Sequence, residues 1–118
     1  MPSVPMTVVE TPFFLRKAAT LLDEDERSEL VAFVAANPEA GRVIPESGGI
    51  RKARWAKEGK GKSGSFRVIY YFHSENFPLF LLTVYAKNQK ANLTKAERNE
   101  FKKLVPILVR TYVKGRKQ

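Results

Sequence analysis

The sequence contains no cysteine, one histidine and one tryptophan among its 118 residues. Without cysteine the chain cannot form disulfide bonds or thiolate metal sites, which fits a reducing compartment. The opening residues, MPSVPMTVVETPFF, lack the basic start and the long apolar run of a signal peptide. No segment approaches the ~18 apolar residues of a membrane span. We therefore expect a cytoplasmic protein with no membrane partner.

Charge is divided unevenly along the chain. Residues 1–50 carry four Lys or Arg against eight Asp or Glu, a net charge of −4, whereas residues 51–118 carry seventeen against four, a net charge of +13. The densest segment, residues 48–67, reads GGIRKARWAKEGKGKSGSFR and holds seven cations and one carboxylate. Such a region attracts a polyanion, nucleic acid above all, or an acidic partner protein.

A chain of this length forms one domain, which we assign to residues 1–118. Its first predicted element is a short strand at 7–10. Thr11 is placed to cap a first helix, and Asp23 to cap a second helix that ends at Asn37.

Three strands and a last helix follow. The strands are rich in aromatic and β-branched residues and span 50–56, 65–73 and 79–85. Asn92 or Thr94 caps the helix, in which Pro106 should introduce a kink or an early end. We expect residues 114–118 to fray. The apolar stripe of the helix comprises Phe101, Leu104, Val105, Leu108, Val109 and Tyr112.

The order β-α-α-β-β-β-α predicts an α+β domain with a mostly antiparallel sheet of about four strands, two N-terminal helices and a C-terminal helix. We expect the helices to cover one face of the sheet and to leave the other open. Because side chains alternate along a strand, Lys52 and Arg54 share one side, and Arg67 can join them on the open face.

The arrangement of the cations favours phosphate binding over an idle solvated loop. They continue from the loop into strands, where side chains are held, and the loop glycines let the backbone approach a phosphate closely. Lys87 and Lys90 follow the next strand, so the cations converge on one rim. The loop GKGKSG lacks the spacing of a Walker phosphate loop.

The available residue types restrict the chemistry of such a site. His73 stands alone and suits a structural role, so RNA cleavage by a pair of histidines is excluded. Scarce carboxylates in the basic half argue against a two-metal nuclease. Lysine and arginine suffice, because guanidinium groups bind a phosphate bidentately and a lysine crowded by cations can act as general acid or base. We expect no metal and no cofactor.

Four motifs, in this order along the chain, resemble the RelE/HigB branch of the RelE/ParE toxin superfamily. They are GGIRKAR, GKGKSG, SFRVIYYF and LLTVYAKN, and the likeness extends from about Met6 to Val109. The resemblance implies a RelE-like fold and the toxin of a type II toxin–antitoxin system. Such toxins are ribosome-dependent mRNA endonucleases, or mRNA interferases, which cut A-site mRNA and leave a 2′,3′-cyclic phosphate. A cognate acidic antitoxin inhibits them.

The resemblance also implies the site residues. Arg67 should clamp the phosphate, and Lys60 and Lys62 are candidates for the acid or base. Tyr112 fits the helical stripe and receives no catalytic role, which leaves the identity of the base open. The catalytic set is Lys52, Arg54, Lys60, Lys62, Arg67 and Lys87. Further RNA contacts are expected from Arg51, Lys57, Lys90 and Trp55.

Two other functions remain open from the sequence. A ParE-type toxin resembles these proteins in fold but poisons DNA gyrase, and it needs no phosphate clamp. A plain RNA-binding module would position RNA without cutting it. Trp55 is the only obvious stacking aromatic on the basic strands, fewer than such modules usually carry, and packing in the core is its alternative role.

Overall fold

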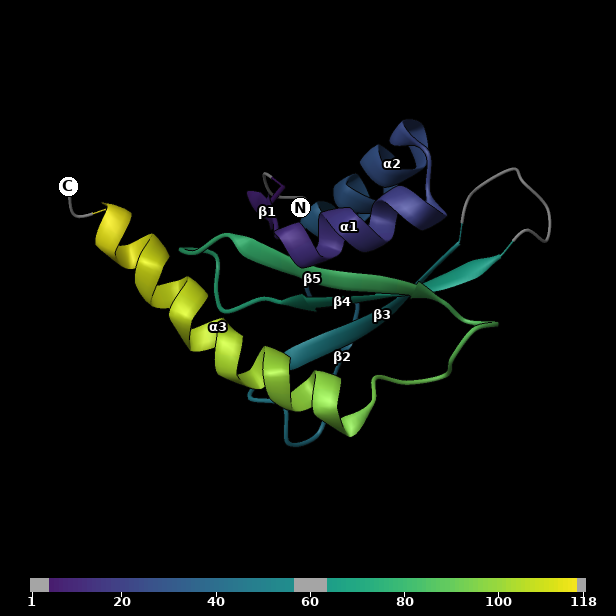
Figure 1. Cartoon of the computed structure of the whole chain (residues 1–118). Coiled ribbons are helices and arrows are strands. Elements are labelled where there is room, and N and C mark those ends of the chain that lie inside the picture. The colour runs from purple at the N-terminus through teal and green to yellow at the C-terminus, as the bar shows by residue number, and fades with distance from the viewer. Residues whose placement is uncertain (1–4, 57–63, 117–118) are drawn as a thin grey trace.

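Figure 1 shows a sheet with helices on both sides, in a computed structural model that describes residues 5–56 and 64–116. The helices are α1 (Pro12–Leu21), α2 (Glu24–Ala36) and α3 (Lys95–Arg116). The strands are β1 (Val8–Glu10), β2 (Arg42–Val43), β3 (Ile50–Ala56), β4 (Ser65–Tyr71) and β5 (Leu79–Ala86). The expected α+β class is confirmed. None of the described helices is both long enough and apolar enough to cross a membrane.

The strands form one five-stranded sheet in the order β1-β5-β4-β3-β2. β1 runs parallel to β5, and all other neighbouring pairs are antiparallel, which confirms the mostly antiparallel sheet that the sequence predicts. The short strand β2 was not expected. Its residues Arg42 and Val43 are both exposed, so no apolar pattern marks it, and only pairing with Lys52 and Arg51 of β3 makes it a strand.

The helices cover both faces of the sheet, so the expectation that they share one face is wrong. In Figure 1, α1 and α2 lie on one side of the sheet and α3 crosses the other. The physical reason lies in β5, whose side chains are apolar toward both faces: Leu81 and Leu82 are each fully buried. A strand of this kind needs cover on both sides. The face that carries Lys52 and Arg54 is therefore shared with α3.

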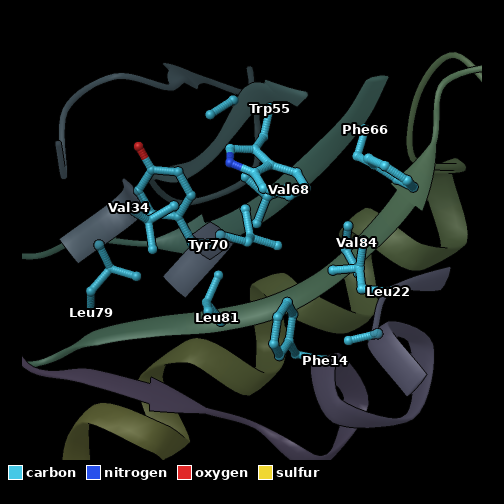
Figure 2. Packing of buried hydrophobic residues seen from close by; sticks show 13 residues of the cluster. Phe14, Leu22, Val34, Trp55, Phe66, Val68, Tyr70, Leu79, Leu81 and Val84 are labelled. Atoms are coloured by element: carbon cyan, nitrogen blue, oxygen red, sulfur yellow. The ribbon is translucent and has the colours of Figure 1, made fainter. Parts of the chain in front are cut away.

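Two apolar cores hold the layers together. In the first, drawn in Figure 2, Phe14 of α1 and Val34 of α2 are fully buried in one cluster with Val68 and Leu81 of the sheet. A second and smaller core joins α3 to the opposite face through Val105. Full burial of a side chain of this size contributes roughly 1.5–3 kcal/mol, so the two cores fix how the strands pair.

The caps predicted for the first two helices are confirmed. The Thr11 hydroxyl accepts a hydrogen bond from the Phe14 amide (3.3 Å) and donates one to the Leu81 carbonyl (2.7 Å), which ties α1 to β5. Asp23 and Glu26 form a reciprocal capping box at the start of α2, with both hydrogen bonds 2.8 Å long. Local sequence therefore determines where both helices begin.

Helix α3 begins at one of its two expected caps and extends further than expected. Thr94, rather than Asn92, caps it, because the Thr94 hydroxyl accepts from the Glu97 amide (3.0 Å). The helix then continues through Pro106 to Arg116, so Pro106 does not end it early. Proline has no N–H group, so the carbonyl one turn before Pro106 lacks its helical hydrogen bond. Pro106 is exposed, so water can bind that carbonyl instead. The helix also includes the first residues of the tail that we expected to fray.

Tyr70 of β4 anchors the segment that leads into β2. Its fully buried hydroxyl donates to the Pro38 carbonyl (2.8 Å) and accepts from the Gly41 amide (2.9 Å). Burial raises the pKa of Tyr70, which keeps the hydroxyl protonated as a donor. A Cβ atom at Gly41 would lie 3.0 Å from both this hydroxyl and the Lys52 carbonyl, so glycine allows the close approach.

We predict that Tyr70→Phe lowers the free energy of unfolding by about 1–3 kcal/mol, because the buried Gly41 amide loses its hydrogen-bond partner. Urea denaturation followed by circular dichroism measures the change. Tyr71→Phe is the matched control, since the contact of its hydroxyl with His73 Nδ1 is exposed and 3.4 Å long. Equal losses in the two variants would contradict the anchoring role of Tyr70.

Candidate active site

Two arginines face each other across β3 and β4. The strand register sets Arg54 directly opposite Arg67, and Arg67 directly opposite Tyr85 of β5. Residues opposed in this way point to the same face of a sheet. Their neighbours Trp55 and Phe66 point into the first core, so these three side chains lie on the face that α3 occupies. We call Arg54, Arg67 and Tyr85 the arginine row.

The arginine row concentrates positive charge on strands that have no acidic residue, since β3, β4 and β5 contain no Asp or Glu. Arg54 is exposed and Arg67 is half-buried. Like charges directly opposite each other on neighbouring strands destabilise a sheet. An anion bound between the two guanidinium groups would remove that repulsion, and a phosphate matches their planar donors.

Lys52 and Lys87 flank the arginine row. Lys52 lies two positions before Arg54 on the same face of β3, and its Nζ donates to Asn92 Oδ1 at 2.7 Å. The Lys87 amide donates to the Ser65 carbonyl at 3.1 Å, which places this exposed lysine at the end of β4 that carries Arg67. The structure therefore places three of the predicted catalytic cations, Arg54, Arg67 and Lys87, toward one end of the sheet. A fourth, Lys52, lies two positions further along β3 on the same face as Arg54.

Tyr85 is the member of the row that sequence reasoning missed. Its ring is 2% exposed, and its hydroxyl donates to the Ala91 carbonyl at 3.3 Å. Burial raises the pKa of Tyr85, and the nearby Glu97 carboxylate adds to this effect while Arg67 opposes it. A signal was present in the sequence, because a tyrosine near the end of a buried strand needs a partner for its hydroxyl.

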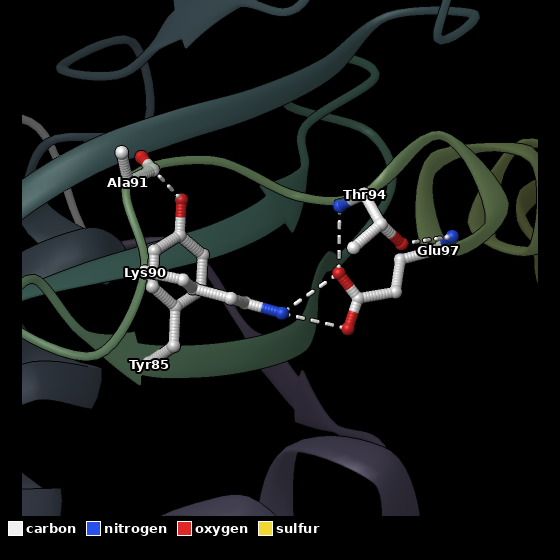
Figure 3. Close-up of polar contacts among 5 residues, drawn as sticks. All are labelled: Tyr85, Lys90, Ala91, Thr94 and Glu97. Atoms are coloured by element: carbon white, nitrogen blue, oxygen red, sulfur yellow. Dashed lines mark hydrogen bonds and ion pairs between the residues drawn. The ribbon is translucent and has the colours of Figure 1, made fainter.

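A set of polar contacts fixes the loop between β5 and α3, as Figure 3 shows. The Lys90 ammonium donates to both carboxylate oxygens of Glu97 at 2.7 Å and lies 5.1 Å from the Tyr85 ring centroid. Glu97 also accepts from the Thr94 amide at 2.8 Å. Burial alone would raise the pKa of Glu97, but hydrogen bonds from Lys90 and Thr94 and the Lys90 charge lower it overall.

Two expected RNA contacts lie elsewhere. Arg51 points to the opposite face from Lys52, because it sits one position earlier on β3, and its Nη1 donates to the Gly41 carbonyl at 2.7 Å. Trp55 is 8% exposed and packs on Phe66 in the first core, with ring centroids 5.9 Å apart. Its ring offers no free face for a base, so the structure supports the core-packing alternative.

The remaining expected site residues have a structural role or cannot be described. Lys90 is engaged by Glu97 and Tyr85, so it holds the loop rather than presenting a free ammonium group. Lys57, Lys60 and Lys62 lie outside the described residues.

His73 and Tyr112 belong to an aromatic group near the opposite end of β4. His73 packs edge-on against Phe77, with ring centroids 4.9 Å apart, and Phe77 contacts Tyr112 at 5.9 Å. Tyr112 also packs against the second core, as its place in the helical stripe predicts. Both residues thus have the packing roles that the sequence suggested. Within the described part of the chain, no three His, Asp or Glu side chains gather closely enough to hold a metal ion.

This fold is that of the RelE-like toxins. The structure of the RelBE2 toxin–antitoxin complex from Mycobacterium tuberculosis matches it with a TM-score of 0.54 and 23% identity, over 70% of this chain and 99% of that one. A mutant of the Escherichia coli toxin RelE in its free state matches with a TM-score of 0.52 and 16% identity, over 74% of this chain and 88% of that one.

The sequence itself identifies the family. A family model described as the RelE toxin of the RelE/RelB toxin–antitoxin system matches residues 14–114, which is most of the chain. The protein therefore belongs to the RelE toxin family.

We predict that Glu97→Gln lowers the free energy of unfolding at pH 7 by less than about 1 kcal/mol, because the ion pair with Lys90 is lost while the capping hydrogen bond is retained. The Glu97 carboxylate is 40% exposed, so solvent screens the pair. The pKa of Glu97 is lowered in the folded chain, so its contribution is present above the unfolded pKa and is lost as the pH falls through the folded value.

Thermal unfolding at several pH values tests this. The difference between the parent and Glu97→Gln should shrink from pH 7 toward pH 3. Glu100→Gln, an exposed site on the same helix, is the control and should show no such trend. A difference that stays constant with pH would contradict the role of the Glu97 charge.

Proposed function

We propose that this toxin is a ribosome-dependent endoribonuclease that cleaves mRNA in the ribosomal A site, with the arginine row holding the scissile phosphate. The observation that carries the proposal is the register that sets Arg54 and Arg67 directly opposite each other on one face. Lys52 and Lys87 lie beside this pair, and the RelE family assignment supports the same function. Since its substrate would be mRNA on the ribosome, the toxin would act in the cytoplasm.

The proposed reaction uses the 2′-hydroxyl of the RNA itself. The 2′-oxygen attacks the adjacent phosphorus, the bond from phosphorus to the 5′-oxygen breaks, and the products carry a 2′,3′-cyclic phosphate and a free 5′-hydroxyl. A base removes the proton of the 2′-hydroxyl, and an acid donates a proton to the leaving 5′-oxygen. The guanidinium groups of Arg54 and Arg67 would stabilise the extra negative charge on the phosphorane.

The proposed acid and base are lysines. Lys52 and Lys87 flank the row, and Lys60 and Lys62 are the candidates from the glycine-rich loop. The reaction would then need no metal and no cofactor. A lysine side chain is ordinarily protonated near neutral pH and then cannot accept a proton, so most of the acceleration must come from phosphate binding and from alignment of the 2′-oxygen with the leaving group. A ribosome that holds the mRNA in position supplies that alignment, which is why we propose ribosome dependence.

The proposed regulatory partner is a cognate antitoxin with acidic character. The structure similar to this one from Mycobacterium tuberculosis is described as a toxin–antitoxin complex, which supports such a partner here. Residues 51–118 carry a net charge of +13, so an acidic segment laid over the arginine row would gain electrostatic attraction and exclude RNA from the phosphate site.

We predict that Arg67→Ala lowers the rate of mRNA cleavage by about 10²–10³, because one preorganised donor to the phosphorane is lost. Mapping of mRNA 5′ ends after brief induction measures it: the parent should give cuts in phase with codons and confined to translated regions, and the variant should not. Arg110→Ala is the matched control, since Arg110 is an exposed arginine on α3 remote in sequence from the row.

Three results would overturn the proposed function. The first is full toxicity in Arg67→Ala and in Lys87→Ala. The second is continued translation with failure of DNA supercoiling, which would favour gyrase poisoning. The third is binding of RNA without any cut, which would instead favour a non-catalytic RNA-binding module.

We predict that Arg54→Gln is at least as stable as the parent while it loses cleavage activity. Removing one of two like charges that face each other across β3 and β4 relieves repulsion, which is worth a few tenths of a kcal/mol in a sheet. Urea denaturation at low ionic strength measures the gain, and ~0.5 M salt should abolish it because salt screens the repulsion. A clear loss of stability would mean that Arg54 has a structural role.

A further inference from the structure

A cationic groove lies beside the arginine row. It has a volume of about 530 Å³ and is formed where β2, β3 and the start of α3 meet. Four cations line it: Arg42 of β2, Lys52 of β3, and Lys95 and Arg98 of α3. No Asp or Glu is among its lining residues, so we call this the cationic groove.

Arg98 has unused hydrogen-bonding capacity in this groove. Its Nε is buried and has no hydrogen-bond partner in the described part of the chain. Its Nη1 lies 3.8 Å from the carboxylate of Glu46, whose side chain is 78% exposed, so this contact is long and open to solvent. The Arg98 side chain is 21% exposed, so its terminal nitrogens, rather than the buried Nε, are the donors that a groove-bound anion would reach.

The groove also has an apolar side. Ile44 and Leu93 line it, and both pack against the second core, which holds them in place. Cations next to a fixed apolar surface are suited to a nucleotide, whose phosphate binds the cations while its base lies against the apolar side chains. An acidic peptide would pair with the cations but would gain less binding free energy from the apolar side chains.

Lys52 connects the groove to the arginine row. It lines the groove, and it lies two positions from Arg54 on the same face of β3, or about 7 Å along the strand. The groove is therefore close enough to the arginine row to take the next part of an RNA strand whose phosphate binds there. The hydrogen bond from Lys52 to Asn92, another lining residue, holds the lysine at this junction.

We propose that the cationic groove binds the nucleotide next to the scissile phosphodiester, with Arg42 and Arg98 holding its phosphate and Ile44 and Leu93 contacting its base. This subsite rests on the proposed function, because it deepens the account of the RNA substrate. It gives the toxin contacts to RNA beyond the arginine row, through residues to which no catalytic role is assigned. The groove residues would position the strand, and the arginine row would act on the reacting phosphate.

The test measures binding of an RNA that cannot be cut. The probe is a fluorescein-labelled RNA hexanucleotide with methylated 2′-hydroxyls. Fluorescence anisotropy measures its affinity for the full chain at salt concentrations from about 25 to about 200 mM, over which phosphate contacts make binding salt-dependent. Arg98→Gln and Arg42→Gln each remove one groove cation. Lys95→Gln is a further variant, and we expect it to fold as the parent does because the Lys95 side chain is exposed.

Each groove variant should weaken binding by about 5–10-fold at the lowest salt, and should reduce the slope of log affinity against log salt by about 0.7, the value for one contact to single-stranded RNA. Arg110→Gln, an arginine on the same helix outside the groove lining, should leave both quantities unchanged. Leu93→Ala should weaken binding without changing the slope, because it removes a contact to the base and no charge.

The inference is overturned if the parent does not bind the probe, or if the groove variants bind it as the parent does. It is also overturned if the groove variants lose affinity only for an acidic peptide such as oligoglutamate, which would make the groove a protein site. The proposed function fails separately: if the parent does not cut mRNA on ribosomes while the groove variants still weaken probe binding, the subsite stands and the nuclease does not.

Discussion

The register between β3 and β4 is the constraint on which the candidate site depends. Because side chains alternate along a strand, a slip of one residue would turn Arg54 away from Arg67 and toward the opposite face. Apolar packing prevents that slip from both sides, with Val68 and Tyr70 in the core under α1 and α2 and Ile69 in the core under α3. The two opposed arginines repel each other, so the cores must hold them together.

Helix α3 has two structural tasks that meet at this site. It completes the second core, and its first turn binds the loop that follows β5 through the pair of Lys90 and Glu97. The same loop carries Asn92, which accepts a hydrogen bond from Lys52. The helix therefore covers part of the face that bears the arginine row, positions a lysine at the edge of that row, and forms one side of the cationic groove.

The distribution of charge suits a protein that binds a polyanion. The cations of the arginine row and of the groove lie on one face, whereas Arg51, one position from Lys52, is held on the other face by the Gly41 carbonyl. Opposed like charges cost stability, and a buried donor without a partner costs more. Bound phosphate would reverse the first of these costs.

Local sequence was enough to predict most elements and the cationic character of the site, because caps, strand propensity and charge are properties of short segments. Thr11 and Asp23 cap helices where expected, and the alternation that puts Lys52 with Arg54 is a property of any strand. The faces that the helices cover, the burial of Trp55 and the strand β2 could not be predicted in this way. They depend on contacts between distant parts of the chain, which decide the side of the sheet that each apolar stripe can reach.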